Sequence, residues 1–127
     1  RKLRSMEGIF FIENPDVLPY LLIADVMVGD TSSILAEFCV LDKPIITFKT
    51  KSGKRTDPEL EQLIQQFSAR IESFHELQNA IEFELENPGH KSSDRKNATK
   101  IMFDDLSPDA GKKAADQIQL LLKRGRQ

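Results

Sequence analysis

The order of apolar and polar residues along the chain predicts alternating strands and helices. Two short apolar runs, Val26–Val28 and Ile45–Phe48, have the length and composition of buried strands. Between them, apolar residues recur at helical spacing from Ile34 to Cys39, and Pro44 ends this helix. A strand that leads into a helix and returns to a second strand is a βαβ unit. The pattern therefore predicts a parallel sheet.

The same patterning predicts further elements on both sides of this unit. The continuous apolar run Gly8–Ile12 is typical of a buried parallel strand, and residues 69–72 are typical of a short edge strand. Helices are predicted over residues 17–24, from Pro58, from Ser73, after Ser92 or Ser93, and from Ser107. The expected fold class is α/β, with a parallel sheet of about four strands and helices on both faces, in a single domain spanning residues 1–127.

Two of these helices have apolar faces that we expect to pack against the core. In the helix from Ser73, the inward positions are Leu77, Ala80, Ile81 and Leu85. In the last helix, the packing stripe consists of Ala114, Ala115, Ile118, Leu121 and Leu122.

The turn between the first strand of the βαβ unit and its helix carries the candidate chemistry. The segment Asp30-Thr31-Ser32-Ser33 offers hydroxyl and carboxylate groups that can cap free N–H groups. A helix N-terminus also attracts phosphate, because its N–H groups are unpaired and carry partial positive charge. Glu37 follows Ser33 by four residues on the same helix face, within reach of a ribose or sugar hydroxyl. Two interpretations fit this pattern: ordinary capping with a solvated Glu37, or a phosphate-binding turn.

The residues around this turn resemble a known family. Asp25–Ile34, followed by Leu41–Ile46, resembles the C-terminal domain of the CDP-glycerol glycerophosphotransferases, the teichoic-acid primase and polymerase family. Those enzymes carry Asp-Val-Leu-Ile-Thr-Asp-Tyr-Ser-Ser and Leu-Asp-Lys-Pro segments at this separation. The frame is more distantly similar to the UDP-N-acetylglucosamine 2-epimerases, although serines stand here where that family has glycines. Both families have the GT-B architecture, so the resemblance implies a three-layer Rossmann-like half-domain.

The resemblance also implies a substrate and a set of site residues. A nucleotide-diphosphate donor of the CDP-glycerol type would bind at the carboxyl edge of the sheet, and no cofactor is expected beyond it. Ser32 and Ser33 would donate hydrogen bonds to its phosphates, and Asp30 would hold the turn. Thr31 would flank the turn where the family has tyrosine, and Glu37 would bind a donor hydroxyl. The acceptor would be a polymer or lipid-linked, and the product a bacterial cell-envelope polymer such as teichoic acid.

The catalytic base is expected on an N-terminal domain outside this sequence. We therefore expect the chain to be a piece of a longer protein and to be inactive by itself. Two alternatives remain open at this point: a UDP-N-acetylglucosamine 2-epimerase-like domain, and a nucleotide-binding or interaction domain without chemistry.

Composition narrows these possibilities further. The 127 residues carry a net charge of −2, which gives no support for nucleic-acid binding. The single cysteine, Cys39, lies on the apolar face of its helix and is expected to be a buried, inert thiol. His75 is expected to be an exposed first-turn residue, and no His, Cys, Asp or Glu cluster has the spacing of a metal site.

Charge and hydropathy also bear on location. The basic segment Lys49–Arg55 follows the strand Ile45–Phe48, at the edge where open α/β sheets bind ligands, and is a candidate anion contact if it is not simply solvated. No apolar run approaches the 18 residues of a membrane span. We expect a cytoplasmic domain, with the basic Arg1–Glu7 segment as a possible peripheral contact at the inner face of the plasma membrane.

Overall fold

Three short strands form one parallel sheet in the computed structural model, which describes residues 7–30, 32–49 and 57–124. The strands are β1 (Met27–Gly29), β2 (Ile45–Phe48) and β3 (Ala69–Ile71), in the order β1-β2-β3. Met27 pairs with Ile45, and Ile46 pairs with Ala69. The central strand β2 is buried over its first three residues, as expected for a parallel strand covered on both faces.

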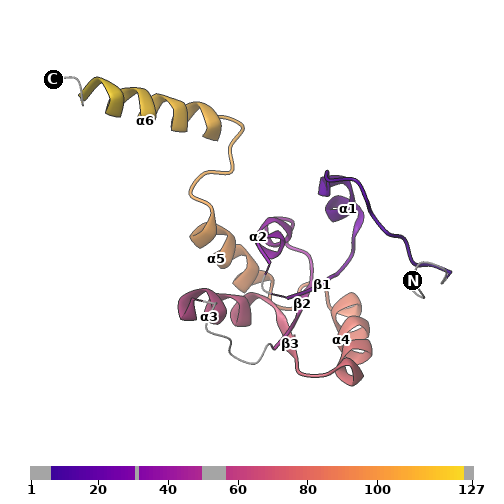
Figure 1. The fold of residues 1–127 in the computed structure, drawn as a ribbon. Coiled ribbons are helices and arrows are strands. Elements are labelled where there is room, and N and C mark those ends of the chain that lie inside the picture. Colours follow the sequence, from indigo (N-terminus) through magenta and orange to yellow (C-terminus); the bar gives the residue numbers. More distant parts are fainter. Residues whose placement is uncertain (1–6, 31, 50–56, 125–127) are drawn as a thin grey trace.

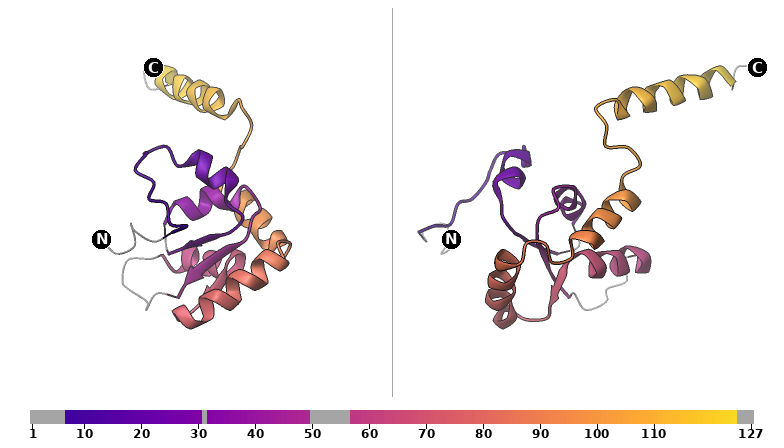
Figure 2. Two further views of the ribbon diagram at one scale, coloured as in Figure 1. Left: turned by 90° about the vertical axis from the view of Figure 1, so that its right-hand side faces the viewer. Right: turned by 180° about the vertical axis from the view of Figure 1, so that it is seen from behind.

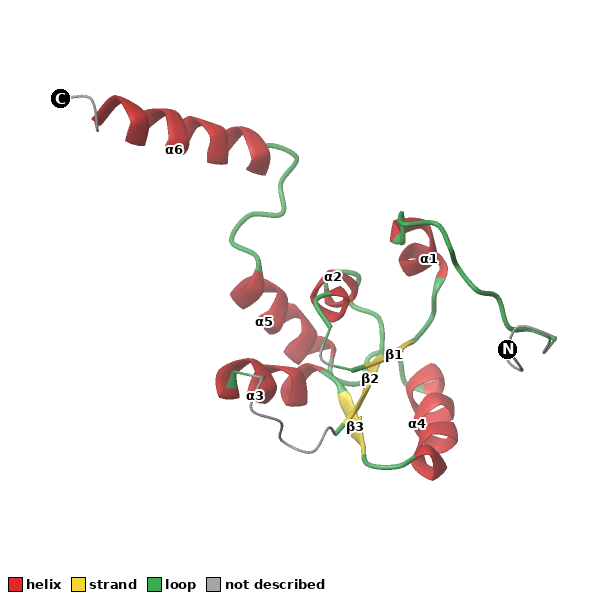
Figure 3. Cartoon of the chain, in the orientation of Figure 1, coloured by secondary structure: helices red, strands yellow, loops and turns green. Residues whose placement is uncertain are grey.

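Helices cover both faces of this sheet (Figures 1 and 3). The described helices are α1 (Leu18–Ile23), α2 (Ile34–Cys39), α3 (Pro58–Phe67), α4 (Phe74–Glu86), α5 (Ser92–Met102) and α6 (Ala110–Arg124). Figures 1 and 2 show α2, α3 and α5 on one side of the sheet and α4 on the other. This confirms the α/β class and the three-layer, Rossmann-like arrangement.

The hydrophobic core lies mainly between the sheet and the layer of α2, α3 and α5. Its fully buried side chains come from four elements and include Leu35, Phe38, Ile45, Phe67 and Ala98. The helical spacing of the apolar residues in α2 therefore places them where the sequence predicted, against β2 and α5.

The predicted strand at Gly8–Ile12 is wrong. These residues form no strand, and Ile9, Phe10, Phe11 and Ile12 are 39%, 88%, 48% and 47% exposed. A continuous apolar run becomes a buried strand only where a neighbouring strand pairs with its backbone, and no described residue pairs with the free side of β1. The described sheet therefore has three strands where about four were expected.

Two of the predicted packing faces also differ from the structure. In α4, Leu77, Ala80 and Ile81 are half-buried as predicted, but Leu85 is 48% exposed and the buried residue is Glu84, which is turned toward His90. In α6 no residue is buried, and Ile118 is 58% exposed. Figures 1 and 2 show α6 standing clear of the sheet. Helical periodicity predicts an apolar face but not whether the same chain supplies its partner.

Candidate functional site

The candidate turn lies at the carboxyl end of β1, where that strand leads into α2. Because the strands are parallel, β1, β2 and β3 all end at this edge, with Gly29 paired to Thr47 and Thr47 to Arg70. Ligands of open α/β sheets bind in the crevice outside such an edge. The structure therefore places the predicted site where the fold would receive a ligand.

The serines of the turn present their side chains to solvent. Asp30, Ser32 and Ser33 are exposed, whereas Thr31 lies outside the described residues. Ser33 is the N-cap residue of α2, but its side chain makes no capping hydrogen bond, so the capping interpretation does not hold for this residue. The turn is closed by backbone bonds instead, from Leu35 N to Ser32 O (3.1 Å) and from Ala36 N to Ser33 O (3.0 Å). The Ser33 hydroxyl is therefore not used in capping the helix.

Gly29 sets how closely the turn approaches β1. A Cβ atom at this position would lie 2.9 Å from Leu35 Cδ2, closer than side-chain packing allows. Leu35 is buried in the core, so it cannot move aside without opening a gap there. The glycine thus lets the first turn of α2 pack directly against the end of the strand.

Glu37 lies in α2, four residues beyond Ser33, and is exposed. Its placement one turn along the helix agrees with the spacing from which it was chosen. Helix α2 has only six residues, so its dipole is small and the chemistry of this edge depends on side chains and individual N–H groups.

The ends of β2 and β3 add charged side chains to the same edge. Lys49 Nζ lies 2.8 Å from Glu72 Oε1 in an exposed ion pair. Arg70, in the middle of β3, donates from Nη1 to Thr47 Oγ1 at 3.4 Å. Of the predicted basic segment Lys49–Arg55, only Lys49 lies within the described residues. Arg70 was not among the residues chosen from sequence, because a cation within a three-residue strand is typical of an ordinary edge strand.

The opposite end of α2 is fixed by the Leu-Asp-Lys-Pro segment. Asp42 lies three residues after α2 ends and adopts a left-handed backbone conformation (φ 52°), which aspartate tolerates better than most residues. Its carboxylate accepts from Ser92 Oγ (2.7 Å) and Arg95 Nε (3.0 Å), and pairs with Lys96 Nζ (3.2 Å). Although burial alone would raise it, these three partners hold the pKa of Asp42 below its ordinary value.

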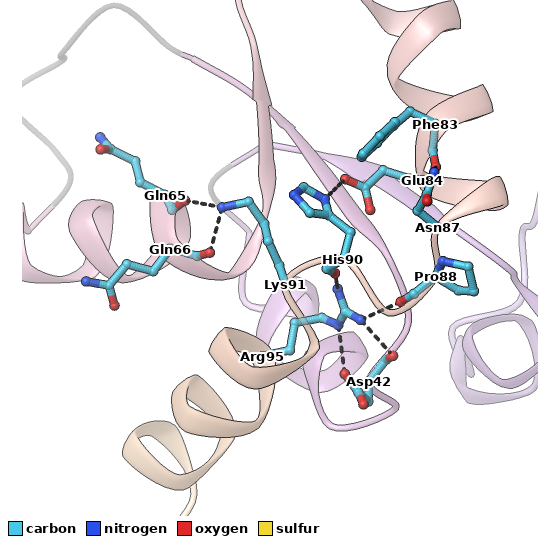
Figure 4. Close-up of polar contacts among 10 residues, drawn as sticks. All are labelled: Asp42, Gln65, Gln66, Phe83, Glu84, Asn87, Pro88, His90, Lys91 and Arg95. Carbon is cyan, nitrogen blue, oxygen red and sulfur yellow. Dashed lines mark hydrogen bonds and ion pairs between the residues drawn. The ribbon is translucent and has the colours of Figure 1, made fainter.

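Arg95 is the centre of this cluster (Figure 4). Its side chain is 1% exposed, and besides Asp42 Oδ1 it donates to the carbonyl oxygens of Asp42 (3.1 Å), Pro88 (2.8 Å) and His90 (2.6 Å). The next residue of the segment, Lys43, donates from Nζ to the carbonyl oxygens of Leu22 and Ala24, at the end of α1. The segment therefore fastens α5 and α1 to the central βαβ unit.

A second polar pair, in which Glu84 is buried and His90 is exposed, lies beside this cluster. Glu84 Oε1 is 2.6 Å from His90 Nδ1, and the His90 ring stands edge-on to Phe83 at 5.1 Å between centroids. Sequence reasoning assigned His90 no role and did not include Glu84 in the buried face of α4. The neighbouring cavity, of about 300 Å³, is lined by Asp25, Asp42, Lys43, Pro44, Glu84, Leu85 and Pro88. It opens where β1 and β2 begin, at the edge opposite the serine turn.

Other residues singled out from the sequence lie as expected. Cys39 is buried, and burial raises the pKa of its thiol, whose Sγ donates to Arg95 O at 3.3 Å. His75 is exposed. Among the described residues, no group of three or more His, Cys, Asp or Glu side chains could hold a metal ion. Within the same residues, no helix is both long enough and apolar enough to cross a membrane.

Comparison with known proteins identifies one family. The family model described as CDP-Glycerol:Poly(glycerophosphate) glycerophosphotransferase matches residues 2–105, which include the whole sheet and every helix except α6. No curated protein and no solved structure matches the chain. A match over this much of the sequence is decisive, and the chain belongs to the CDP-glycerol:poly(glycerophosphate) glycerophosphotransferase family.

Proposed function

We propose that this chain is the donor-binding part of a glycerophosphotransferase that acts in cell-envelope polymer synthesis. Family membership supports the transfer of glycerophosphate units and favours this activity over a UDP-N-acetylglucosamine 2-epimerase. The observation that carries the donor assignment is the exposed serine turn at the carboxyl edge of the parallel sheet. The donor is of the CDP-glycerol type, and the acceptor is a hydroxyl-terminated polymer or lipid-linked chain.

In this proposal the turn binds the donor diphosphate. The hydroxyls of Ser32 and Ser33 donate to phosphate oxygens, together with free N–H groups at the start of α2. Asp30 holds the turn, Thr31 flanks it, and the exposed Glu37 accepts a hydrogen bond from a donor hydroxyl. Hydrogen bonds to ionised oxygens are about twice as strong as neutral ones, so two hydroxyls suffice to orient a diphosphate.

The transfer step follows from the chemistry of such a donor. The acceptor hydroxyl oxygen attacks the phosphorus that bears glycerol, and the bond from that phosphorus to the bridging diphosphate oxygen breaks. The nucleoside monophosphate leaves with the electron pair, and the hydroxyl proton passes to a general base. Donors fixed at the turn stabilise the charge that grows on the leaving phosphate. We place the base on another domain of a longer polypeptide, and the reaction at the inner face of the plasma membrane.

Calorimetric titration tests the donor assignment. The chain is titrated with CDP-glycerol, CDP and UDP-N-acetylglucosamine, and compared with a Ser32→Ala/Ser33→Ala variant. Each lost hydrogen bond to a charged group is worth about 1.5–3 kcal/mol, so the variant should bind the cytidine ligands at least about tenfold more weakly. Ser93→Ala, an exposed serine of α5, is the matched control and should bind like the parent chain.

Two results would contradict the proposal. Equal binding of CDP-glycerol by the parent chain and the double variant would show that the two serines do not bind the donor. Tighter binding of UDP-N-acetylglucosamine than of CDP-glycerol would contradict a CDP-glycerol donor and favour the epimerase alternative.

A further inference from the structure

Arg70 is a largely buried cation whose hydrogen-bonding capacity is mostly unused. It lies in β3, and its side chain is 14% exposed. Its hydrogen bond to Thr47 Oγ1, at 3.4 Å, is long for such a contact. The nearest carboxylate oxygen, Oε1 of Glu61, is 3.8 Å from Nη2, within ion-pair range but beyond hydrogen-bonding distance. Structural arginines buried to this degree normally have their N–H groups satisfied, as Arg95 does in the same chain.

The Arg70 atoms that make no hydrogen bond are those that recognise a two-oxygen anion. Its Nε and Nη2 are buried and have no hydrogen-bond partner. The N–H bonds of these two nitrogens run parallel along one edge of the guanidinium group. That edge forms the fork that binds two oxygens of a carboxylate or phosphate at once. The structure thus contains an arginine held in place with its bidentate edge unfilled.

A cavity lies beside this arginine. It has a volume of about 260 Å³ and is lined by Lys49, Gln65, Arg70 and Glu72. Lys49 follows β2 and Glu72 follows β3, so the cavity lies at the carboxyl edge of the sheet, which β1 also reaches before the serine turn. Two cations therefore line a hollow on this edge: Lys49, from the basic segment predicted as a candidate anion contact, and Arg70, which was not predicted.

We propose that Arg70 and Lys49 form an anion site for a phosphate ester, with Arg70 as its anchor. The Lys49–Glu72 pair does not oppose this, because its side chains are 58% and 68% exposed and exposed pairs are weak. A bound phosphate replaces Glu72 as the partner of Lys49 and supplies the two acceptors that the Arg70 fork lacks. The choice of phosphate ester rests on the proposed function. Its source is either the donor diphosphate or the phosphodiesters of the polymer acceptor.

The experiment measures binding of CDP-glycerol and of a synthetic glycerol phosphate oligomer to the chain and its variants. Arg70→Gln removes the fork, and Arg70→Lys keeps the charge without it. Lys100→Gln removes an exposed cation of α5 as the control. Circular dichroism establishes that each variant is folded. In parallel, the Arg70 Nε–H resonance, assigned by its loss in Arg70→Gln, reports directly on contact with glycerol 3-phosphate.

We expect Arg70→Gln to weaken at least one ligand about tenfold or more, Arg70→Lys to restore binding only in part, and the control to bind normally. Weakening of the oligomer alone identifies polymer phosphodiesters, and weakening of CDP-glycerol identifies the donor. The Nε–H signal should shift on addition of glycerol 3-phosphate. Unchanged affinities with an unmoved signal would overturn the site and indicate a purely structural arginine paired with Glu61.

The serine variant keeps this test separate from that of the proposed function. If Ser32→Ala/Ser33→Ala loses donor binding while Arg70→Gln binds both ligands normally, only the Arg70 site is refuted. If Arg70→Gln weakens the oligomer while the serine variant binds the donor normally, the donor turn is refuted and the anion site stands.

Discussion

Replacing Arg95 by methionine should be among the most destabilising single changes in this chain. The guanidinium group is 1% exposed and makes hydrogen bonds to Asp42 Oδ1 and to three backbone carbonyl oxygens. Methionine fills a similar volume but donates nothing, so three carbonyl groups and one carboxylate oxygen lose a charged donor. Even at about 1 kcal/mol for each of these four contacts, the value for neutral groups, the loss is at least about 4 kcal/mol. This agrees with the roughly 3–5 kcal/mol observed when one partner of a buried ion pair is removed.

The carboxylate side of the pair moderates this loss but does not cancel it. Asp42 is 31% exposed and keeps Ser92 and Lys96 as partners, so it is not left as an isolated buried charge. The carbonyl oxygens of Pro88 and His90 lose the Arg95 side-chain donor that ties them to α5. We therefore expect the α4–α5 connection to loosen first.

Urea-induced unfolding followed by circular dichroism measures the effect. Lys96→Met is the matched control, because it removes the other cation on Asp42 from a side chain that is 66% exposed and should cost less than about 1 kcal/mol. With a total stability of about 5–15 kcal/mol, the Arg95 variant should unfold at a clearly lower urea concentration. A loss no larger than that of the control would refute the view that Arg95 holds the fold together.

Three further predictions follow from the same contacts. The pKa of Asp42 is lower in the folded state, so the ionised carboxylate stabilises the fold above the unfolded pKa, near 3.9, and this stabilisation is lost as the pH falls toward the folded-state pKa. In unfolding measured from pH 6 to pH 3, Asp42→Asn should therefore lose less stability with falling pH than the parent chain. Gly29→Ala places a methyl group 2.9 Å from Leu35 and should cost about 1–3 kcal/mol and weaken CDP-glycerol binding, whereas Gly89→Ala, with nothing within 4 Å, should do neither. Lys43→Met removes the donor to two carbonyl groups at the end of α1, so amide hydrogen exchange should become faster in α1 than in the parent chain, and change less in α3. An equal increase in both helices would contradict the view that Lys43 anchors α1.

The central βαβ unit could be predicted from sequence because its signals are local. Strands β1 and β2 are short apolar runs, and the intervening helix repeats apolar residues at helical spacing before Pro44. Each of these features depends only on residues that are at most four positions apart in the sequence. The edge strand at Ala69–Ile71 was predicted for the same reason.

The errors lie where an apolar segment needs a partner that the pattern does not identify. Phe10 belongs to a run that has strand composition, yet it is 88% exposed because no described strand pairs with it. Leu121 has helical spacing, yet it is 66% exposed on α6, the helix that lies beyond the family match. Periodicity records that an apolar face exists, whereas burial depends on what else is present to cover it.

The buried polar residues could not be found from local spacing, because their partners are distant in sequence. Arg95 and Asp42 are 53 residues apart, and Lys43 reaches carbonyl groups 19 and 21 residues before it. The sequence contains one weak indication of this cluster: Ser92, Arg95 and Lys96 lie on one face of α5, and all three can donate hydrogen bonds to a carboxylate. In Arg70, the informative feature is that Nε and Nη2 make no hydrogen bond, which only a three-dimensional structure can reveal.

These contacts explain why the two motifs of the family resemblance differ in character. The Leu-Asp-Lys-Pro segment is saturated with internal partners: Asp42 binds α5, and Lys43 binds the end of α1. At the other end of α2, the Ser33 side chain makes no capping hydrogen bond, and Ser32 and Ser33 are exposed. A helix anchored firmly at its C-terminal end can hold its N-terminal turn in position without using the turn's own hydroxyls. The segment with many partners thus supports the fold, whereas the exposed Ser32 and Ser33 are the residues that we propose bind the donor.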